Sequence, residues 1–197
     1  PRLRVAGSTL PVVPCGAVAG VLARSDAQRG VWRSAAGTEA ALLGITGLTL
    51  LLTKAQQEQL NPANINALRF LQNQFLVWGG RTRSGDPAQR YIAVTRLRWL
   101  IEDSIRQGLA WTASERNGEA VWSLVRERVD GFLRRLHRDG ALAGEKESEA
   151  YFVRCDQTTM TAADLAEGRL VCELGLAFLR PAEFTVIRVV LAVTPAA

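Results

Sequence analysis

The sequence contains few of the residues that usually carry catalysis or bind metals. Its 197 residues include one histidine, His137, and three cysteines, at positions 15, 155 and 172. An odd number of widely spaced cysteines without a CxxC pair argues against a disulfide framework and a zinc knuckle, and is typical of a reducing compartment. The chain also has no apolar run of about eighteen residues, so a membrane span is not expected.

Nucleotide-binding and zinc-protease signatures are missing as well. No GxxxxGK[ST], GxGxxG or HExxH occurs. His137 has no nucleophile near it in sequence, and we interpret it as a surface or partly satisfied histidine. Cys155 is followed by Asp156, but no second histidine is present to act as its base. We therefore expect no catalytic, cofactor-binding or metal site, with a cysteine-dependent enzyme as a remaining alternative.

Arginine supplies almost all of the positive charge. The formal net charge is +5, and only Lys54 and Lys146 among the 24 basic residues are lysine. Arginine favours fixed, bidentate pairing with carboxylates or phosphates over diffuse attraction. The composition therefore points to an acidic partner.

The apolar spacing predicts an α/β fold, with a mixed sheet flanked by helices and an antiparallel C-terminal end. Predicted helices cover residues 16–29, 54–60, a short segment within 61–71, 94–108, 121–138 and 162–167. Predicted strands cover residues 48–53, 75–82, 111–115, 150–155, 170–179 and 184–193. Thr53 and Thr161 are the expected N-caps of the helices that follow them.

The predicted helix 121–138 separates apolar from charged residues most clearly. Its apolar side combines Val121, Trp122, Val125, Val129, Phe132, Leu133 and Leu136, and its charged side has Arg126, Arg128, Arg134, Arg135 and Arg138 against Glu127 and Asp130. Such a side is either a solvated surface or a docking surface. Nucleic-acid binding is the alternative function, although Trp122 and Phe132 are placed for the core and not for stacking on bases.

Several ordered motifs resemble one known family. The stretch FVRCDQTTMTAADLAEGRLVCELGLAFLRPAEF resembles the C-terminal signature of contractile tail sheath proteins. The motifs PCGAVAGVLARSDAQRGVWRSAAG, LNPANINALRF, VWGGRT, RYIAVTRLRWLIEDSIRQGLAW and FLRRLHRDGALAG extend the resemblance over nearly the whole chain. The sequence departs from the family at Cys15, where serine is common, and at Phe178-Leu179, which replaces a Pro-Val pair.

The resemblance implies a structural protein. Residues 1–197 would form a single sheath core domain, with the family's N-terminal arm and variable outer domain lying outside this sequence. The chain starts at Pro1 and not at Met, so we also expect a segment before it. Sheath subunits stack as hexameric rings around an inner tube and contract; the implied partners are further copies, the inner tube, the baseplate and the terminator or cap proteins. The resemblance also implies that the protein binds no nucleic acid or membrane directly and that assembly takes place in the bacterial cytoplasm.

Two sets of residues are candidates for these contacts. Tube docking by a sheath helix, which the resemblance implies, is assigned to the charged side of helix 121–138: Arg126, Arg134, Arg135 and Arg138. Family subunits are joined by strands added to a neighbour's sheet, for which the candidates are Phe184, Val186, Arg188 and Val190. Because an unpaired apolar terminal strand promotes aggregation, segment 184–193 itself indicates a partner.

Overall fold

The computed structural model describes the chain except for residues 1, 6, 8–9, 180–184 and 195–197. It divides into two compact units, Pro1–Arg96 and Leu97–Ala197. The boundary falls within helix α3 (Ile92–Gly108). The expectation of a single sheath core domain over residues 1–197 stays a prediction.

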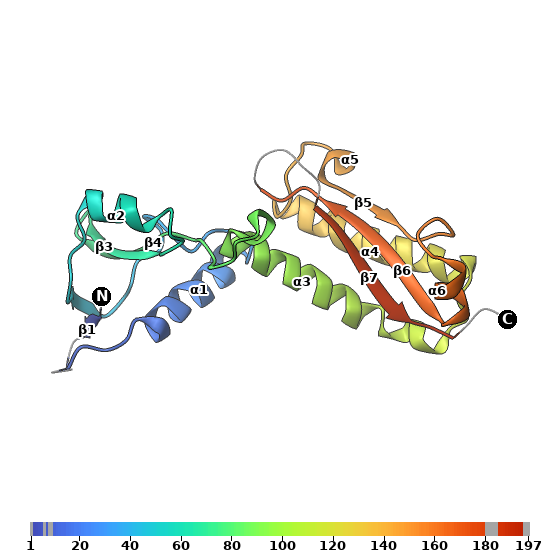
Figure 1. The fold of residues 1–197 in the computed structure, drawn as a ribbon, viewed down its shortest axis with the longest axis horizontal. Coiled ribbons are helices and arrows are strands. Elements are labelled where there is room, and N and C mark those ends of the chain that lie inside the picture. Colours follow the sequence, from blue (N-terminus) through green and yellow to red (C-terminus); the bar gives the residue numbers. More distant parts are fainter. Residues whose placement is uncertain (1, 6, 8–9, 180–184, 195–197) are drawn as a thin grey trace. The chain divides into compact units, whose positions relative to one another are not determined.

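The first unit contains two α-helices and two small antiparallel sheets (Figure 1), and it has an apolar cluster of its own. Its elements are β1 (Leu3–Val5) paired with β2 (Ile45–Leu48), β3 (Ala67–Leu71) paired with β4 (Gln74–Trp78), α1 (Cys15–Arg29), α2 (Lys54–Leu60) and the 3₁₀ helix η1 (Pro87–Gln89). The cluster consists of Leu3, Val21, Ala40, Leu42, Leu68 and Val77. Removing these side chains from water is the main stabilisation of this unit.

The cap expected at Thr53 is confirmed. Its hydroxyl accepts a hydrogen bond from the backbone N–H of Gln56, and the Gln56 side chain accepts one from the backbone N–H of Thr53 at 3.0 Å. This reciprocal capping box satisfies two N–H groups that a helix start leaves without partners. It explains why a helix of only seven residues begins at Lys54.

Two predictions in this unit are wrong. The short helix expected within 61–71 is strand β3, because a tight turn at Gln72 and Asn73, with φ of 49° and 60°, pairs it with β4. The strand expected at 48–53 ends at Leu48, since β1 offers it only three residues to pair with. Leu50 and Leu51 beyond it are exposed.

The second unit is a three-stranded antiparallel sheet with helices α3 and α4 on one side (Figure 1). The strand order is β5-β6-β7, with β5 at Tyr151–Arg154, β6 at Arg169–Leu176 and β7 at Thr185–Ala192. Its helices beyond α3 are η2 (Ala110–Ser114), α4 (Glu119–Arg138), α5 (Glu147–Ala150) and α6 (Ala162–Ala166). The strand expected at 111–115 is therefore wrong; Thr112 instead donates its hydroxyl and its backbone N–H to the carbonyl of Leu109, closing a 3₁₀ turn.

Residues on β7 alternate between the core and solvent. Ile187, Val189 and Leu191 are buried, whereas Arg188 and Val190 are exposed. Such alternation is expected for a strand with one face against the helices. The central strand β6 is instead buried over most of its length.

The expected fold class is confirmed. Helices and strands alternate, and the C-terminal strands are antiparallel as expected. The paired strands form three separate antiparallel sheets. Among the described residues, one isolated bridge, between Arg116 and Thr194, is parallel.

Candidate functional site

Helix α4 is held in place by its apolar side. Val121, Val125, Val129 and Leu133 are at most 7% exposed. At the start of the helix, buried Trp122 donates its indole N–H to the side-chain oxygen of Asn117 at 2.7 Å. A buried indole without a partner would cost free energy, so this bond fixes the helix start as well as its rotation.

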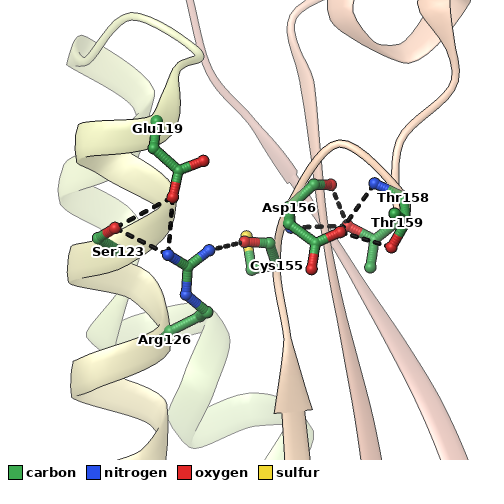
Figure 2. Close-up of polar contacts among 7 residues, drawn as sticks. All are labelled: Glu119, Ser123, Arg126, Cys155, Asp156, Thr158 and Thr159. Carbon is green, nitrogen blue, oxygen red and sulfur yellow. Dashed lines mark hydrogen bonds and ion pairs between the residues drawn. The ribbon is translucent and has the colours of Figure 1, made fainter.

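One flank of α4 is tied to the sheet through Arg126 (Figure 2). The Nη2 group of Arg126 lies 2.8 Å from the carboxylate of Glu119 and 2.8 Å from the hydroxyl of Ser123, and its Nη1 group donates to the carbonyl oxygen of Cys155. Hydrogen bonding to Glu119 raises the pKa of Arg126. The guanidinium is therefore occupied by groups of its own chain.

The turn that follows Cys155 has its own hydrogen bonds (Figure 2). The carboxylate of Asp156 accepts a hydrogen bond from the backbone N–H of Thr158 at 2.7 Å. The hydroxyl of Thr159 donates to the backbone carbonyl of Asp156 and to that of Val171. An aspartate that bonds the backbone two residues later stabilises a turn locally. This hydrogen-bonded turn therefore helps to hold the Cys155 carbonyl in the position where Arg126 contacts it.

Arg134 lies on the same flank and is also paired. Its Nη2 is 2.6 Å from Asp130 and its Nε is 3.2 Å from Glu147. The hydrogen bond to Glu147 raises the pKa of Arg134. Arg126 and Arg134 stay predicted tube contacts, but docking at either would have to compete with these bonds.

The other flank of α4 carries unpaired charge. Arg128 and Arg135 on this flank, and Arg138 near the end of the helix, are exposed and form no ion pair with any residue that the structure describes. Arg128 is positioned by the ring of Trp111, whose centroid lies 4.9 Å from its guanidinium carbon. Arg135 and Arg138 were predicted as contacts, whereas Arg128 was seen in the sequence and left out of the candidate set.

A groove separates this flank from α3. It has a volume of about 180 Å³ and an apolar floor that includes Ile105, Leu109 and Phe132, with Arg128 and Arg135 on its rim. The groove could not be predicted from the sequence, because its walls come from two helices that only folding brings together. Gly131 lines a shallow depression beside the groove, and a glycine inside an otherwise strong helical pattern was a signal for that depression.

Two of the candidates on the last strand, Arg188 and Val190, lie on the outer face of the sheet. Arg188 lies opposite Glu173, whose carboxylate is 3.1 Å from Arg188 and 3.7 Å from Arg154. Val190 is 47% exposed on the same face. Val186 lies in β7 opposite Gly175, and Phe184 lies outside the described residues.

Strand β7 is the last strand of its sheet. Among the described residues it pairs along its length with β6 alone, and beyond its end Thr194 exchanges backbone bonds with Glu115 and Asn117. An edge strand presents N–H and C=O groups that a further strand can pair with.

The residues of the cysteine-enzyme alternative do not form a site. Cys155 is fully buried, and its hydrogen bond with Cys172, with burial, raises the pKa of its thiol. A nucleophilic thiol instead needs a lowered pKa and access. The Nε2 atom of His137 lies 2.9 Å from the carbonyl oxygen of Gly144. Within the described part of the chain, no cluster of three or more metal-binding side chains occurs, and no helix is long and apolar enough to cross a membrane.

Comparison with known proteins agrees with this architecture. Residues 84–192, more than half of the chain, match the family described as the phage tail sheath C-terminal domain. A prophage major tail sheath protein of Pseudomonas aeruginosa (strain UCBPP-PA14) is 27% identical over 171 residues, which are 84% of this chain and 42% of that protein. These matches define a class of structural tail proteins.

Solved structures give the same result over nearly the whole chain. A chain in the baseplate of the anti-feeding prophage is 37% identical, with a TM-score of 0.85, over 95% of this chain and 52% of its own length. A chain of the contracted PVC sheath complex, an extracellular contractile injection system, is 34% identical with a TM-score of 0.85, over 95% of this chain and 53% of its own. The present chain therefore spans about half the length of these relatives. It belongs to the phage tail sheath C-terminal domain family.

Proposed function

We propose that this chain is part of a structural subunit of a contractile tail sheath. Copies assemble as stacked hexameric rings around an inner tube, and contraction drives the tube through a target envelope. The observation that carries the proposal is the match to anti-feeding prophage and PVC chains at 37% and 34% identity over 95% of the chain. Assembly in the bacterial cytoplasm, with a baseplate at one end and a terminator or cap at the other, belongs to the same proposal.

Copies are joined through the C-terminal sheet. The open edge of β7 is supported as the joint by two features: its pairing along its length with β6 alone, and its exposed Val190. A strand donated by a neighbouring copy extends the sheet by backbone hydrogen bonds, which hold copies together whatever their surface sequence. Burying Val190 adds an apolar contribution.

The sheath contacts its tube through helix α4. Arg135 and Arg138 support this role because both guanidiniums are exposed and unpaired within the described chain. Each exposed charge pair contributes about 0 to 1 kcal/mol. Contacts this weak, repeated around every ring, hold the extended sheath on the tube and are released together when subunits move outward.

Contraction requires an extended lattice that is kinetically trapped above a lower-energy contracted one. The energy is then stored in the arrangement of subunits, and no cofactor or nucleotide is consumed.

Electron microscopy tests the proposal. The full-length protein is expressed with and without the tube protein from its own locus and imaged in negative stain. We expect striated hollow cylinders of defined width. Monodisperse particles under both conditions would refute the proposal, and steeply salt-dependent binding of DNA or RNA by them would favour the nucleic-acid-binding alternative.

A further inference from the structure

The two buried cysteines lie opposite each other at the end of strand β5. Arg154, the last residue of β5, pairs with Glu173 in an antiparallel register, so the next residue, Cys155, lies opposite Cys172 on β6. Directly opposite residues of an antiparallel pair point to the same face of the sheet. Both cysteines are fully buried, as this placement requires. They are far apart in the sequence, and only the pairing of the two strands brings them together.

The backbone hydrogen bonds show which kind of ladder position this pair occupies. The N–H of Ala177 donates to the carbonyl of Ala150 at 2.8 Å, which makes these two residues a hydrogen-bonded pair in the same register. Hydrogen-bonded pairs alternate with non-hydrogen-bonded ones, so Cys155 and Cys172, an odd number of steps further, form a non-hydrogen-bonded pair. Opposite Cα atoms are then about 4.5 Å apart. Disulfides join Cα atoms separated by about 4.4 to 6.8 Å, so this position admits a bridge.

Two contacts support the continuation of the ladder beyond the end of β5. A carbonyl at a non-hydrogen-bonded position points away from the paired strand, and that of Cys155 accepts from Arg126 on α4 (Figure 2). One step further, the hydroxyl of Thr159 lies 3.2 Å from the backbone nitrogen of Asp156 and 2.9 Å from the carbonyl oxygen of Val171. This hydroxyl takes the place of the next ladder hydrogen bond. The backbone of Cys155 is therefore held on both sides.

The state of the thiols makes them slow to react. The hydrogen bond with Cys172, and then burial, raise the pKa of the Cys155 thiol. Because the thiolate is the reactive form, such a thiol resists bulky external reagents. The pair therefore stays reduced in a reducing compartment, and its oxidation requires a small oxidant and time.

We infer that Cys155 and Cys172 form an intramolecular disulfide when the protein meets peroxide outside a reducing compartment. Hydrogen peroxide oxidises one thiol to a sulfenic acid and releases one water molecule. The second thiol attacks that sulfur, which forms the S–S bond and releases a second water molecule. Two thiols thus lose two protons and two electrons to one peroxide. The bridge goes beyond the proposed sheath function and forms whether or not the chain assembles.

The bridge fastens the end of β5 to the central strand of its sheet. It closes a loop that contains the turn at Asp156 and helix α6, and a disulfide stabilises a protein chiefly by restricting the unfolded chain. Under the proposed function, the particle acts on a target envelope outside the reducing cytoplasm, where disulfides form and persist. The C-terminal sheet is then stabilised after assembly and not before it.

Peptide mapping tests the bridge directly. Trypsin places the two cysteines in separate peptides, residues 155–169 and 170–188. The full-length protein is kept in dithiothreitol or treated overnight with hydrogen peroxide, then unfolded in an alkylating agent and digested without reduction. We expect the two peptides to be joined in most peroxide-treated molecules and separate in dithiothreitol. Separate peptides after peroxide, whether unmodified or carrying sulfinic acids, would overturn the inference.

Thermal unfolding tests whether the bridge stabilises the native sheet. We expect peroxide treatment to raise the midpoint by about 5 °C, given the size of the closed loop. Cys172→Ala should abolish both the joined peptides and the rise, whereas Cys15→Ser, at an exposed cysteine of the first unit, is the matched control and should retain both.

Two further results would count against native pairing. One is a bridge that lowers the midpoint, and the other is a bridge that forms only when peroxide is added to protein unfolded in urea. If Cys172→Ala does not fold, the peptide map of the unmodified chain still decides, since it needs no variant. None of these measurements depends on sheath assembly, so failure of the bridge and failure of the proposed function are seen separately.

Discussion

The guanidinium of Arg126 donates through Nη1 to the carbonyl oxygen of Cys155, which joins the middle of helix α4 to the end of strand β5 (Figure 2). The link spans 29 residues of sequence. Arg126, which is one of the predicted tube contacts, therefore forms a hydrogen bond within its own chain.

Removing this bond should destabilise the protein. We expect Arg126→Gln to lower the free energy of unfolding by about 1 to 2 kcal/mol, because a charged donor is lost from a carbonyl that stays partly buried. Urea unfolding of the unassembled protein measures the change. Arg135→Gln is the control and should alter stability by less than about 0.5 kcal/mol, since Arg135 is exposed and unpaired. Equal effects of the two substitutions would contradict this division of the helix.

A methyl group at Gly175 should overpack the outer face of the sheet. A Cβ atom there would overlap the ring of Phe152 on the neighbouring strand. We expect Gly175→Ala to cost about 1 to 3 kcal/mol of unfolding free energy. In combination with Phe152→Ala the additional cost of Gly175→Ala should largely disappear, which a double-mutant cycle by thermal or urea unfolding measures. Additive effects would show that the ring moves aside freely.

The three cysteines should differ in reactivity. Cys15 is exposed, whereas Cys155 and Cys172 are fully buried and the pKa of the Cys155 thiol is raised by its hydrogen bond with Cys172. A thiol reagent such as dithionitrobenzoate should therefore titrate one thiol in the folded protein at pH 8 and three in denaturant, because the thiolate is the reactive form. Cys15→Ser should abolish the fast reaction. Fast reaction of a second thiol in the folded state would argue against the buried pair.

Acid should weaken the start of helix α6 through Asp164. Hydrogen bonds from the side chain and backbone of Thr161, and then from Arg169, lower the pKa of Asp164 to about 2, well below its unfolded value of about 4. A lowered folded pKa contributes stability that is fully present above about pH 4 and is lost as the pH falls through about 2.

The corresponding experiment compares Asp164→Asn with the unmodified chain. The substituted protein should be less stable at pH 6, and the difference should shrink toward pH 2, as followed by thermal unfolding at each pH. Asp156→Asn gives a second case, because hydrogen bonds from Thr158 also lower the pKa of Asp156. A difference for Asp164→Asn that stays constant with pH would contradict the assignment.

Local sequence signals predicted the helices and caps whose formation depends on neighbouring residues in the sequence. Apolar residues at three- and four-residue spacing identified the helix now seen at Ile92–Gly108 and the one at Glu119–Arg138. Thr161 was identified as a cap and forms one, with its hydroxyl accepting from the N–H of Asp164 at 3.1 Å. These features depend on residues within a few positions of one another.

The failures occurred where a distant partner decides. Segment 67–71 has apolar residues that suit either a helix or a strand, and pairing with β4 makes it a strand. Segment 48–53 has β-branched and apolar residues, but within the described chain its pairing with β1 ends at Leu48. Tertiary context commonly overrides local preference in short segments such as these.

The sequence by itself determined the family, the α/β class, the long helices and the presence of an arginine-rich side on α4, since these follow from motif order and from the 3.6-residue period of a helix. Only the tertiary structure decided what each arginine does. Arg126 and Arg134 lie on the flank where the carbonyl of Cys155 and the carboxylate of Glu147 are within reach, whereas Arg128 and Arg135 line a groove with α3. The physical reason is that helical spacing fixes the direction of a side chain, while its partners come from segments that only folding brings near.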